Sequence, residues 1–174
     1  MLESLAFALV KTFVSFMFEQ HLENMQAVRI QGAPGWYYQQ TAYHVCDSGV
    51  AYGPLRALEE AKADAREHMR ARMQRALESA AHEKYQGRVG TAESALIARF
   101  AQDENLPAFI HGNVVYENLE YSEKKATAYA RACMSEDTLT RYQSDRMLKL
   151  AKSVSHHRRD AAMDTLDAEM QTQP

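Results

Sequence analysis

The chain has 174 residues, enough for one domain with a hydrophobic core and a terminal segment besides. Its 46% hydrophobic and 25% charged residues are ordinary globular usage, which argues against a disordered chain and against a polytopic membrane protein. The 20 basic and 23 acidic side chains leave a formal net charge of −3, so we expect no nucleic-acid partner.

Residues 2–18 are apolar on nearly every side of a helix, with Glu3 and Lys11 as the charged side chains. The stretch is short for a membrane span, and a central lysine is costly in hydrocarbon. It also lacks the basic start and the small-residue cleavage site of a signal peptide. Three interpretations stay open: a signal anchor or interfacial helix, an oligomerisation helix, or a helix packed on the protein's own core. The candidate anchor side chains are Leu5, Phe7, Leu9, Val10, Phe13, Val14, Phe16, Met17 and Phe18.

A Gly-Ala-Pro-Gly-Trp breaker ends at Trp36 and predicts the end of the N-terminal helix and the start of a globular module. Residues 42–52 then predict a strand, with a bulge or bend at 47–49. Aromatic residues gather around this strand. They either cover the core or form a contact surface for another protein, where aromatic anchors are enriched. They are Trp36, Tyr37, Tyr38, Tyr43 and Tyr52.

The segment from 54 to 86 predicts one long amphipathic helix over about 55–85, because apolar residues recur in it at helical spacing. These residues are Leu58, Ala61, Ala65, Met69, Met73, Ala76, Leu77 and Ala80. A face built largely from alanine and methionine is shallow, so we expect it to lie close against a sheet. The charged residues of the helix are expected to pair on an exposed face, which makes them poor acid–base catalysts. They are Glu59, Glu60, Lys62, Asp64, Arg66, Glu67, Arg70 and Arg72.

A second, shorter helix is predicted from 92 to about 102, with Thr91 as its N-cap. We expect its inward side chains to be Ala95, Leu96 and Phe100.

Residues 113–121 and 125–134 predict the two strands of a hairpin that turns at 122–125. Four alanines, at 126, 128, 130 and 132, alternate with larger residues. This period of two favours a strand under the alanine-rich helix, although alanine also suits a helix over 124–134. Ser135 is then placed to cap a helix over about 136–152.

The predicted fold class is α+β, with a small, mainly antiparallel sheet of about three strands packed on one long amphipathic helix. Additional helices are expected at the N- and C-terminal ends. We expect three segments: an apolar N-terminal helix over 1–33, an α+β module over 34–152, and a polar, partly helical C-terminal tail over 153–174.

Two cysteines, Cys46 and Cys133, each lie in a predicted strand, and they suit either a single disulfide or two buried thiols. His44 stands two residues from Cys46 and His111 precedes the hairpin, but a structural zinc site needs four ligands, usually in close pairs. The sequence contains no nucleophile elbow, phosphate-binding glycine loop or His-Glu-x-x-His helix. We therefore expect no enzyme activity, no catalytic residues, no metal and no cofactor.

Several short segments together resemble the lipoprotein-twenty family of small Gram-negative envelope proteins. They are Pro34-Gly35-Trp36, Gly49-Val50-Ala51-Tyr52-Gly53, Ala61-Lys62-Ala63-Asp64-Ala65-Arg66 and the alanine-rich last strand, and the resemblance covers about residues 34–150. It implies a non-enzymatic envelope protein, often attached to the outer membrane, with some relatives associated with flagella or surface assemblies.

The sequence departs from the family pattern in one respect. Family members typically carry a lipoprotein signal and an acylated cysteine, which this sequence does not show. Either the sequence is a mature or shortened form, or residues 2–18 replace the lipid, or the cellular location differs.

The expected function is that of a membrane-associated structural protein on the periplasmic side of the bacterial cell envelope. It would act through self-association or by docking to a larger surface assembly of flagellar or outer-membrane type. Its expected partners are further copies of itself or the proteins of that assembly, with membrane contact through the N-terminal helix. The alternative is a soluble cytoplasmic oligomer of unknown role, and the remotest alternative is a metal-dependent enzyme.

Overall fold

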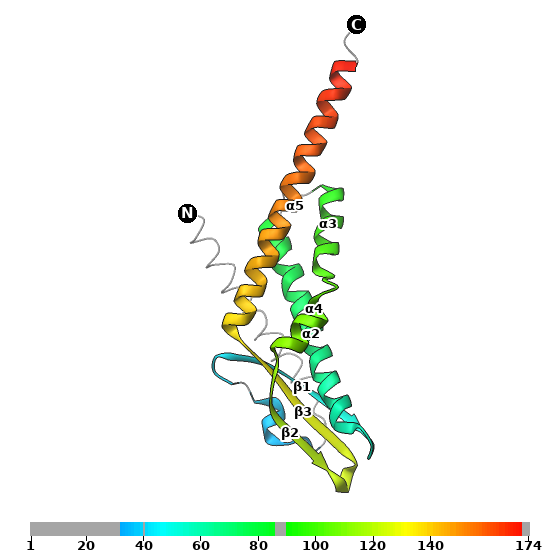
Figure 1. The fold of residues 1–174 in the computed structure, drawn as a ribbon, viewed down its shortest axis with the longest axis vertical. Helices are drawn as coiled ribbons and strands as arrows, with labels where there is room; N and C mark the ends of the chain where they lie inside the picture. Colours follow the sequence, from blue (N-terminus) through cyan, green and yellow to red (C-terminus); the bar gives the residue numbers. More distant parts are fainter. Residues whose placement is uncertain (1–31, 40, 86–89, 172–174) are drawn as a thin grey trace.

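The computed structural model describes residues 32–39, 41–85 and 90–171. Along the chain its elements are η1 (Gly35–Tyr38), β1 (His44–Tyr52), α2 (Ala57–Tyr85), α3 (Thr91–Ala101), α4 (Leu106–Asn113), β2 (Val115–Ser122), η2 (Glu123–Lys125), β3 (Thr127–Ser135) and α5 (Glu136–Gln171) (Figure 1). This arrangement confirms the predicted α+β class. The predicted N-terminal helix and its anchor side chains lie outside the described residues. Among the described helices, none combines the length and apolarity needed to cross a membrane.

The sheet has three antiparallel strands in the order β1-β3-β2, so that β3 is central. Its central place explains why every residue of β3 from Thr127 to Met134 is buried. The predicted hairpin of β2 and β3 is confirmed, and Ala126, with φ of 46°, completes its turn after η2. The predicted bulge in β1 is wrong, because β1 pairs with β3 without interruption from His44 to Tyr52. The irregularity lies instead in β2, between Tyr116 and Asn118.

Helix α2 lies across one face of the sheet, and its contact with β1 and β3 is made by small residues (Figure 1). The alanines of this contact are Ala51, Ala57, Ala61, Ala128 and Ala130. Gly49 marks the closest approach: a Cβ added there would lie 2.2 Å from the Ala61 carbonyl oxygen and 2.3 Å from the Ala65 nitrogen. The prediction that a shallow helix face lies close against a sheet is therefore confirmed.

Replacing Gly49 by alanine is expected to lower the free energy of unfolding by about 3 kcal/mol, because neither backbone can move away cheaply. Denaturation in urea measures the change. Gly112→Ala is the matched control, since a Cβ at that helical position meets no atom within 4 Å. Alanine there should stabilise slightly, by about 0.5 kcal/mol. Equal stability of the two variants would contradict the close packing of α2 on β1.

A larger core lies where the C-terminal half of α2 meets β1, β3, α4 and α5. It contains Val45, Met69, Met73, Ala76, Leu77, Leu106, Ile110, Met134, Leu139 and Tyr142. The predicted apolar stripe of α2 is confirmed except at its start, where Ala57 is buried and Leu58 is exposed. In α3 the prediction is wrong for Ala95, which is exposed, while Ile97 is fully buried. The N-cap of α3 is Gly90 rather than Thr91.

Helix α5 is longer than the sequence indicates. Ser135 caps it as predicted, its hydroxyl oxygen accepting a hydrogen bond from the Thr138 nitrogen at 3.3 Å. Beyond the predicted end near 152 the helix continues to Gln171, so the boundary expected at 153 falls inside one helix. Its middle is held against α2 and α3 by a second core of Ala80, Ala81, Ile97, Met147, Leu150 and Val154.

Candidate functional site

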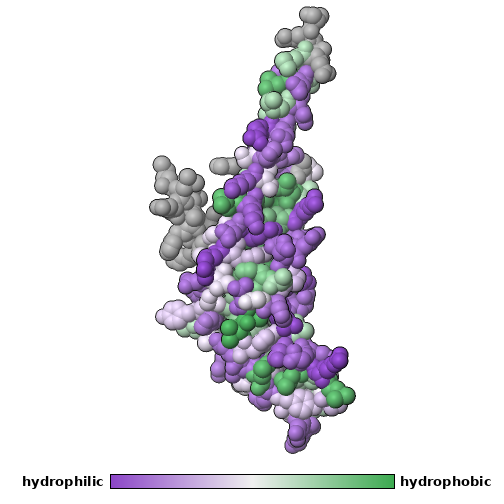
Figure 2. Space-filling view, viewed as in Figure 1, coloured by the Kyte–Doolittle hydropathy of each residue, from purple (hydrophilic) through white to green (hydrophobic). Residues whose placement is uncertain are grey.

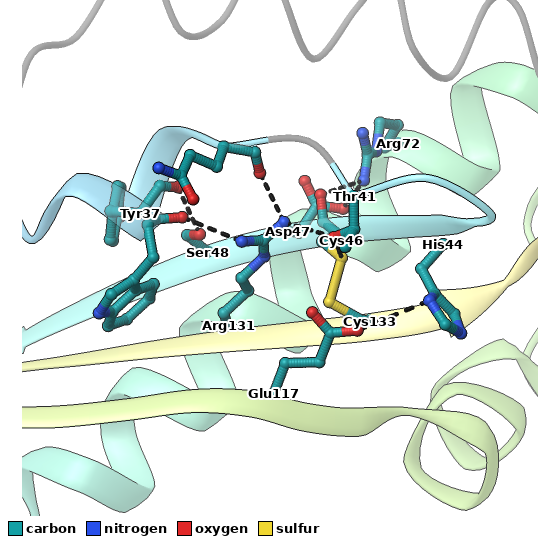
Figure 3. The surroundings of a disulfide bond; sticks show 12 residues. Tyr37, Thr41, His44, Cys46, Asp47, Ser48, Arg72, Glu117, Arg131 and Cys133 are labelled. Carbon is teal, nitrogen blue, oxygen red and sulfur yellow. Dashed lines mark hydrogen bonds and ion pairs between the residues drawn. A yellow bond between two sulfur atoms is a disulfide. The ribbon is translucent and has the colours of Figure 1, made fainter.

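On the face of the sheet opposite α2, the disulfide lies among polar side chains (Figure 3). Val45 packs with the core of α2, and Gly49 contacts its backbone. Because successive side chains of a strand point to opposite faces, the intervening His44, Cys46 and Ser48 lie on the other side. This opposite face carries the two cysteines, His44 and, against Tyr129, the ring of Tyr37.

Cys46 and Cys133 are direct partners across β1 and β3, and the structure joins them in a disulfide. Their Cα atoms are 4.1 Å apart. Both residues are buried, and the Thr41 hydroxyl oxygen lies 3.3 Å from the Cys46 sulfur. Of the two alternatives that the sequence left open, the structure contains the disulfide. The bond links β1 to β3, and the two cysteines are 87 residues apart in the sequence.

Glu117 lies near the disulfide on β2, the strand that pairs with the other edge of β3. It is the additional residue of the β2 irregularity, since Tyr116 pairs with Ala132 and Asn118 with Arg131. One of its carboxylate oxygens and the two sulfurs all lie within 4.8 Å of one another. The same carboxylate is 3.6 Å from His44 Nδ1. Sequence reasoning missed Glu117, because an irregularity in β2 leaves no trace in the local pattern.

The fold separates the three residues that the sequence analysis considered as metal ligands, His44, Cys46 and His111. His44 and Cys46 do share a face, but His111 is an exposed residue of α4. Within the described part of the chain, the group with metal-ligand atoms close together is Cys46, Glu117 and Cys133.

Arg131 holds the segment before β1 against the same face. Its guanidinium donates hydrogen bonds to the carbonyl oxygens of Trp36 and Gln39, at 3.1 and 2.5 Å, and to the Thr41 hydroxyl at 2.6 Å. Burial lowers the pKa of Arg131, and the nearby carboxylate of Glu117 opposes that shift. The main-chain carbonyl groups before β1 therefore bind Arg131, and these bonds hold that segment over the sheet face opposite α2.

The aromatic residues that were predicted either to cover the core or to form a contact surface are separated. Tyr37 is buried, its ring 5.7 Å from that of Tyr129, and burial raises the pKa of its phenol. Trp36 is half-buried and donates a hydrogen bond to Glu120 at 3.2 Å, and Tyr38 packs on the Tyr37 ring. Tyr43 precedes β1 and is 80% exposed, whereas Tyr52 ends that strand and is 69% exposed. The first three residues thus cover the sheet, and the last two lie at opposite ends of a nine-residue strand.

On the α2 side, a buried ion pair joins the helix to β1. Arg72 was expected on an exposed face, but its guanidinium is buried and donates hydrogen bonds to the Asp47 carboxylate and, at 2.9 Å, to the Cys46 carbonyl oxygen. Pairing at the surface, as predicted, occurs between Lys62 and Glu59 and between Arg70 and Glu67. Asp64, also expected to pair on the exposed face of α2, instead accepts a hydrogen bond from the Val50 nitrogen of β1 at 2.9 Å.

A surface hollow of about 420 Å³ between α4 and α5 is lined partly by Asp103 and Tyr142. The Tyr142 hydroxyl donates to the Asp103 carboxylate at 2.7 Å, and the Asn105 nitrogen donates to it at 3.1 Å. Burial alone would raise the pKa of Asp103, but these hydrogen bonds and the nearby charge of Arg146 outweigh it and lower the pKa below its ordinary 3.8. The carboxylate connects the start of α4 with α5, which is a structural role.

Stability should therefore fall in acid because Asp103 must be protonated. A carboxyl group with a lowered pKa stabilises the folded state above its ordinary value of 3.8, and this stabilisation is lost as the pH falls through the lowered pKa. Urea denaturation between pH 7 and pH 2 measures it. We expect Asp103→Asn to lower stability at pH 7 by about 1 to 2 kcal/mol and to flatten the acid limb of the curve. An unchanged acid limb in that variant would contradict this account.

The family resemblance of residues 34–150 stays a prediction. It depends on the spacing of glycine and alanine, and the structure gives these small residues a packing role between α2 and the sheet. No family model, no curated protein and no solved structure matches the chain.

Proposed function

We propose that the protein is a non-enzymatic structural protein of the bacterial cell envelope that works by associating with further copies of itself, and through them with a larger assembly. The observation that carries this proposal is the last part of α5. The helix projects beyond α2 and α3, and its final turns have no neighbouring element in the described part of the chain (Figure 1).

Every residue of α5 from 158 to 170 is exposed. At 1.5 Å per residue this length is about 20 Å of helix. At the start of this exposed stretch Arg158 ties α5 to α3, its guanidinium donating to the Glu93 carboxylate at 2.6 and 3.2 Å. Most of the stability of helices in proteins comes from packing of one face, so a partner along this stretch would stabilise it.

The projecting helix carries both hydrophilic and hydrophobic residues, as Figure 2 shows. Met163, Leu166 and Met170, spaced by three and four residues, are 57%, 54% and 68% exposed. His156, His157, Arg158 and Arg159 form the basic block, and Asp160, Asp164, Asp167 and Glu169 form the acidic block.

A second copy of the same helix fits this pattern in the antiparallel direction. Pairing centred on Met163 sets Arg159 of one copy opposite Asp167 of the other, and the Met163 side chains of the two copies face each other. Symmetric pairing of identical surfaces is the usual way in which protein dimers close. The charge order therefore favours a second copy of this chain as the partner along this helix.

The disulfide supports the envelope location. Structural disulfides form and persist in oxidising compartments such as the periplasm and are rare in the cytosol. Under the alternative of a cytoplasmic oligomer, both thiols would be reduced.

Met163→Lys tests the association, because a charge at the centre of the pairing removes the apolar contact and meets the same charge of the other copy. We expect the unaltered protein to sediment as a dimer and the variant as a monomer that still unfolds cooperatively. Ala161→Lys, on the opposite side of the exposed helix, is the matched control and should remain dimeric. A monomeric unaltered protein at high micromolar concentration, or a dimeric Met163→Lys variant, would overturn the self-association.

Cell fractionation with thiol trapping tests the location separately. The full chain should be recovered with the envelope fraction and with its cysteines oxidised. Recovery in the cytosol with both thiols free would favour the intracellular oligomer, whatever the sedimentation result.

A further inference from the structure

We propose that reduction of the disulfide converts the face around it into a zinc site. Its four ligands are Cys46, Cys133, Glu117 and His44. This site goes beyond the structural role proposed above, since it binds a divalent cation and responds to redox state.

Three strands bring the four side chains to one place (Figure 3). β1 supplies His44 and Cys46 on one face, and β3 supplies Cys133 directly opposite Cys46. The irregularity of β2 adds Glu117, whose carboxylate oxygen lies within 4.8 Å of both sulfurs and 3.6 Å from His44 Nδ1. The ligand atoms of a tetrahedral zinc site lie about 3 to 4 Å apart, as bond lengths of about 2.0 to 2.3 Å require. The proposed site requires the four side chains to draw closer together once the S–S bond is broken.

The donor set is chemically suited to zinc. Thiolate, imidazole and carboxylate are its three protein ligands, and four of them complete a closed site. The two ligands other than the cysteines are partly accessible. The His44 side chain is 43% exposed and the Glu117 side chain 28%, so a cation can approach the buried sulfurs from their side. Arg131 donates to the Thr41 hydroxyl, which itself lies against the Cys46 sulfur, so the site has a polar surround.

The conversion needs a dithiol as reductant. The dithiol supplies two electrons and two protons: its own sulfurs become a disulfide, the Cys46–Cys133 bond breaks, and each cysteine takes one proton. Zn²⁺ then binds both sulfurs and displaces those two protons to solvent. The same two strands stay cross-linked in either state, first by the S–S bond and then through the metal.

Cobalt and zinc titrations of the full chain test the proposal. The protein is reduced with dithiothreitol, freed of reductant and metal under anaerobic conditions, and titrated with Co²⁺. We expect one Co²⁺ per chain, with a thiolate-to-cobalt charge-transfer band and the intense visible bands of tetrahedral cobalt. Zn²⁺ should displace the cobalt and raise the melting temperature of the reduced chain. The oxidised chain should show none of these bands.

Variants that keep the disulfide separate this site from a general loss of folding. Glu117→Gln and His44→Ala are expected to weaken zinc binding to the reduced protein at least about 10-fold, while melting of their oxidised forms shows that they fold. Glu120→Gln on the same strand and His111→Ala on α4 are the matched controls and should bind as the unaltered chain does. The proposal is overturned by reduced protein that takes up no cobalt, by oxidised protein that gives the same bands, or by unchanged affinity in both ligand variants.

Discussion

Reduction of Cys46–Cys133 in metal-free protein is expected to lower the free energy of unfolding by about 4 kcal/mol. The bond closes a loop across 87 residues, and a cross-link stabilises by restricting the unfolded chain, more so for longer loops. For a protein of this size the melting temperature should fall by about 10 °C. Thermal and urea denaturation in the presence of a chelator, with and without dithiothreitol, measure both quantities.

The Cys46→Ala/Cys133→Ala double variant is the control for this experiment. It should match the reduced protein in stability and should not respond to dithiothreitol. A loss below about 1 kcal/mol on reduction would show that other contacts already bring the two strands together in the unfolded chain. Zinc should restore part of the loss in the reduced protein and none in the double variant, which connects this measurement to the proposed site.

Asp47→Ala is expected to lower the free energy of unfolding by about 3 to 5 kcal/mol. Removing one partner of a buried ion pair leaves the other charge without full compensation, and Arg72 is among the most deeply buried large side chains of the structure. The loss should exceed that of any exposed pair on α2. Urea denaturation at pH 7 measures it.

A double-mutant cycle with Arg72→Met distinguishes a lost charge pair from a disturbed strand. Replacing both partners removes both buried charges, so Asp47→Ala/Arg72→Met should recover much of the loss. Glu59→Ala, which breaks the exposed pair with Lys62, should leave stability unchanged within error. If the two losses add without recovery, the Arg72 side chain stabilises through packing and its contact with the Cys46 carbonyl instead.

Much of the architecture follows from local pattern in the sequence. The helical recurrence from Ala61 to Ala80 predicts α2 and its buried face, and the period of two in β3 predicts a strand despite the helical preference of alanine. Ser135 predicts the start of α5 correctly. In each case the side chains that decide the structure lie within a few residues of one another, so the sequence contains the whole interaction.

Other features depended on residues that are distant along the chain. Asp47, the ion-pair partner of Arg72, lies 25 residues before it in the sequence. The charge pattern of the helix alone therefore predicts an exposed Arg72. The irregularity that brings Glu117 to the disulfide exists only relative to the register of β3. Helix α4 passes unnoticed because it is short, although Pro107 suits a first turn.

The sequence by itself thus determined the α+β class, the long alanine-rich helix and the strands under it, since hydrophobic periodicity reports which side of an element is buried. Tertiary structure alone decided what each buried side faces: the pairing of Cys46 with Cys133, the ion pair of Asp47 with Arg72, and the place of Glu117. The physical reason is that a period measures burial within one element, whereas register, ion pairing and ligand geometry are properties of two or more elements in contact.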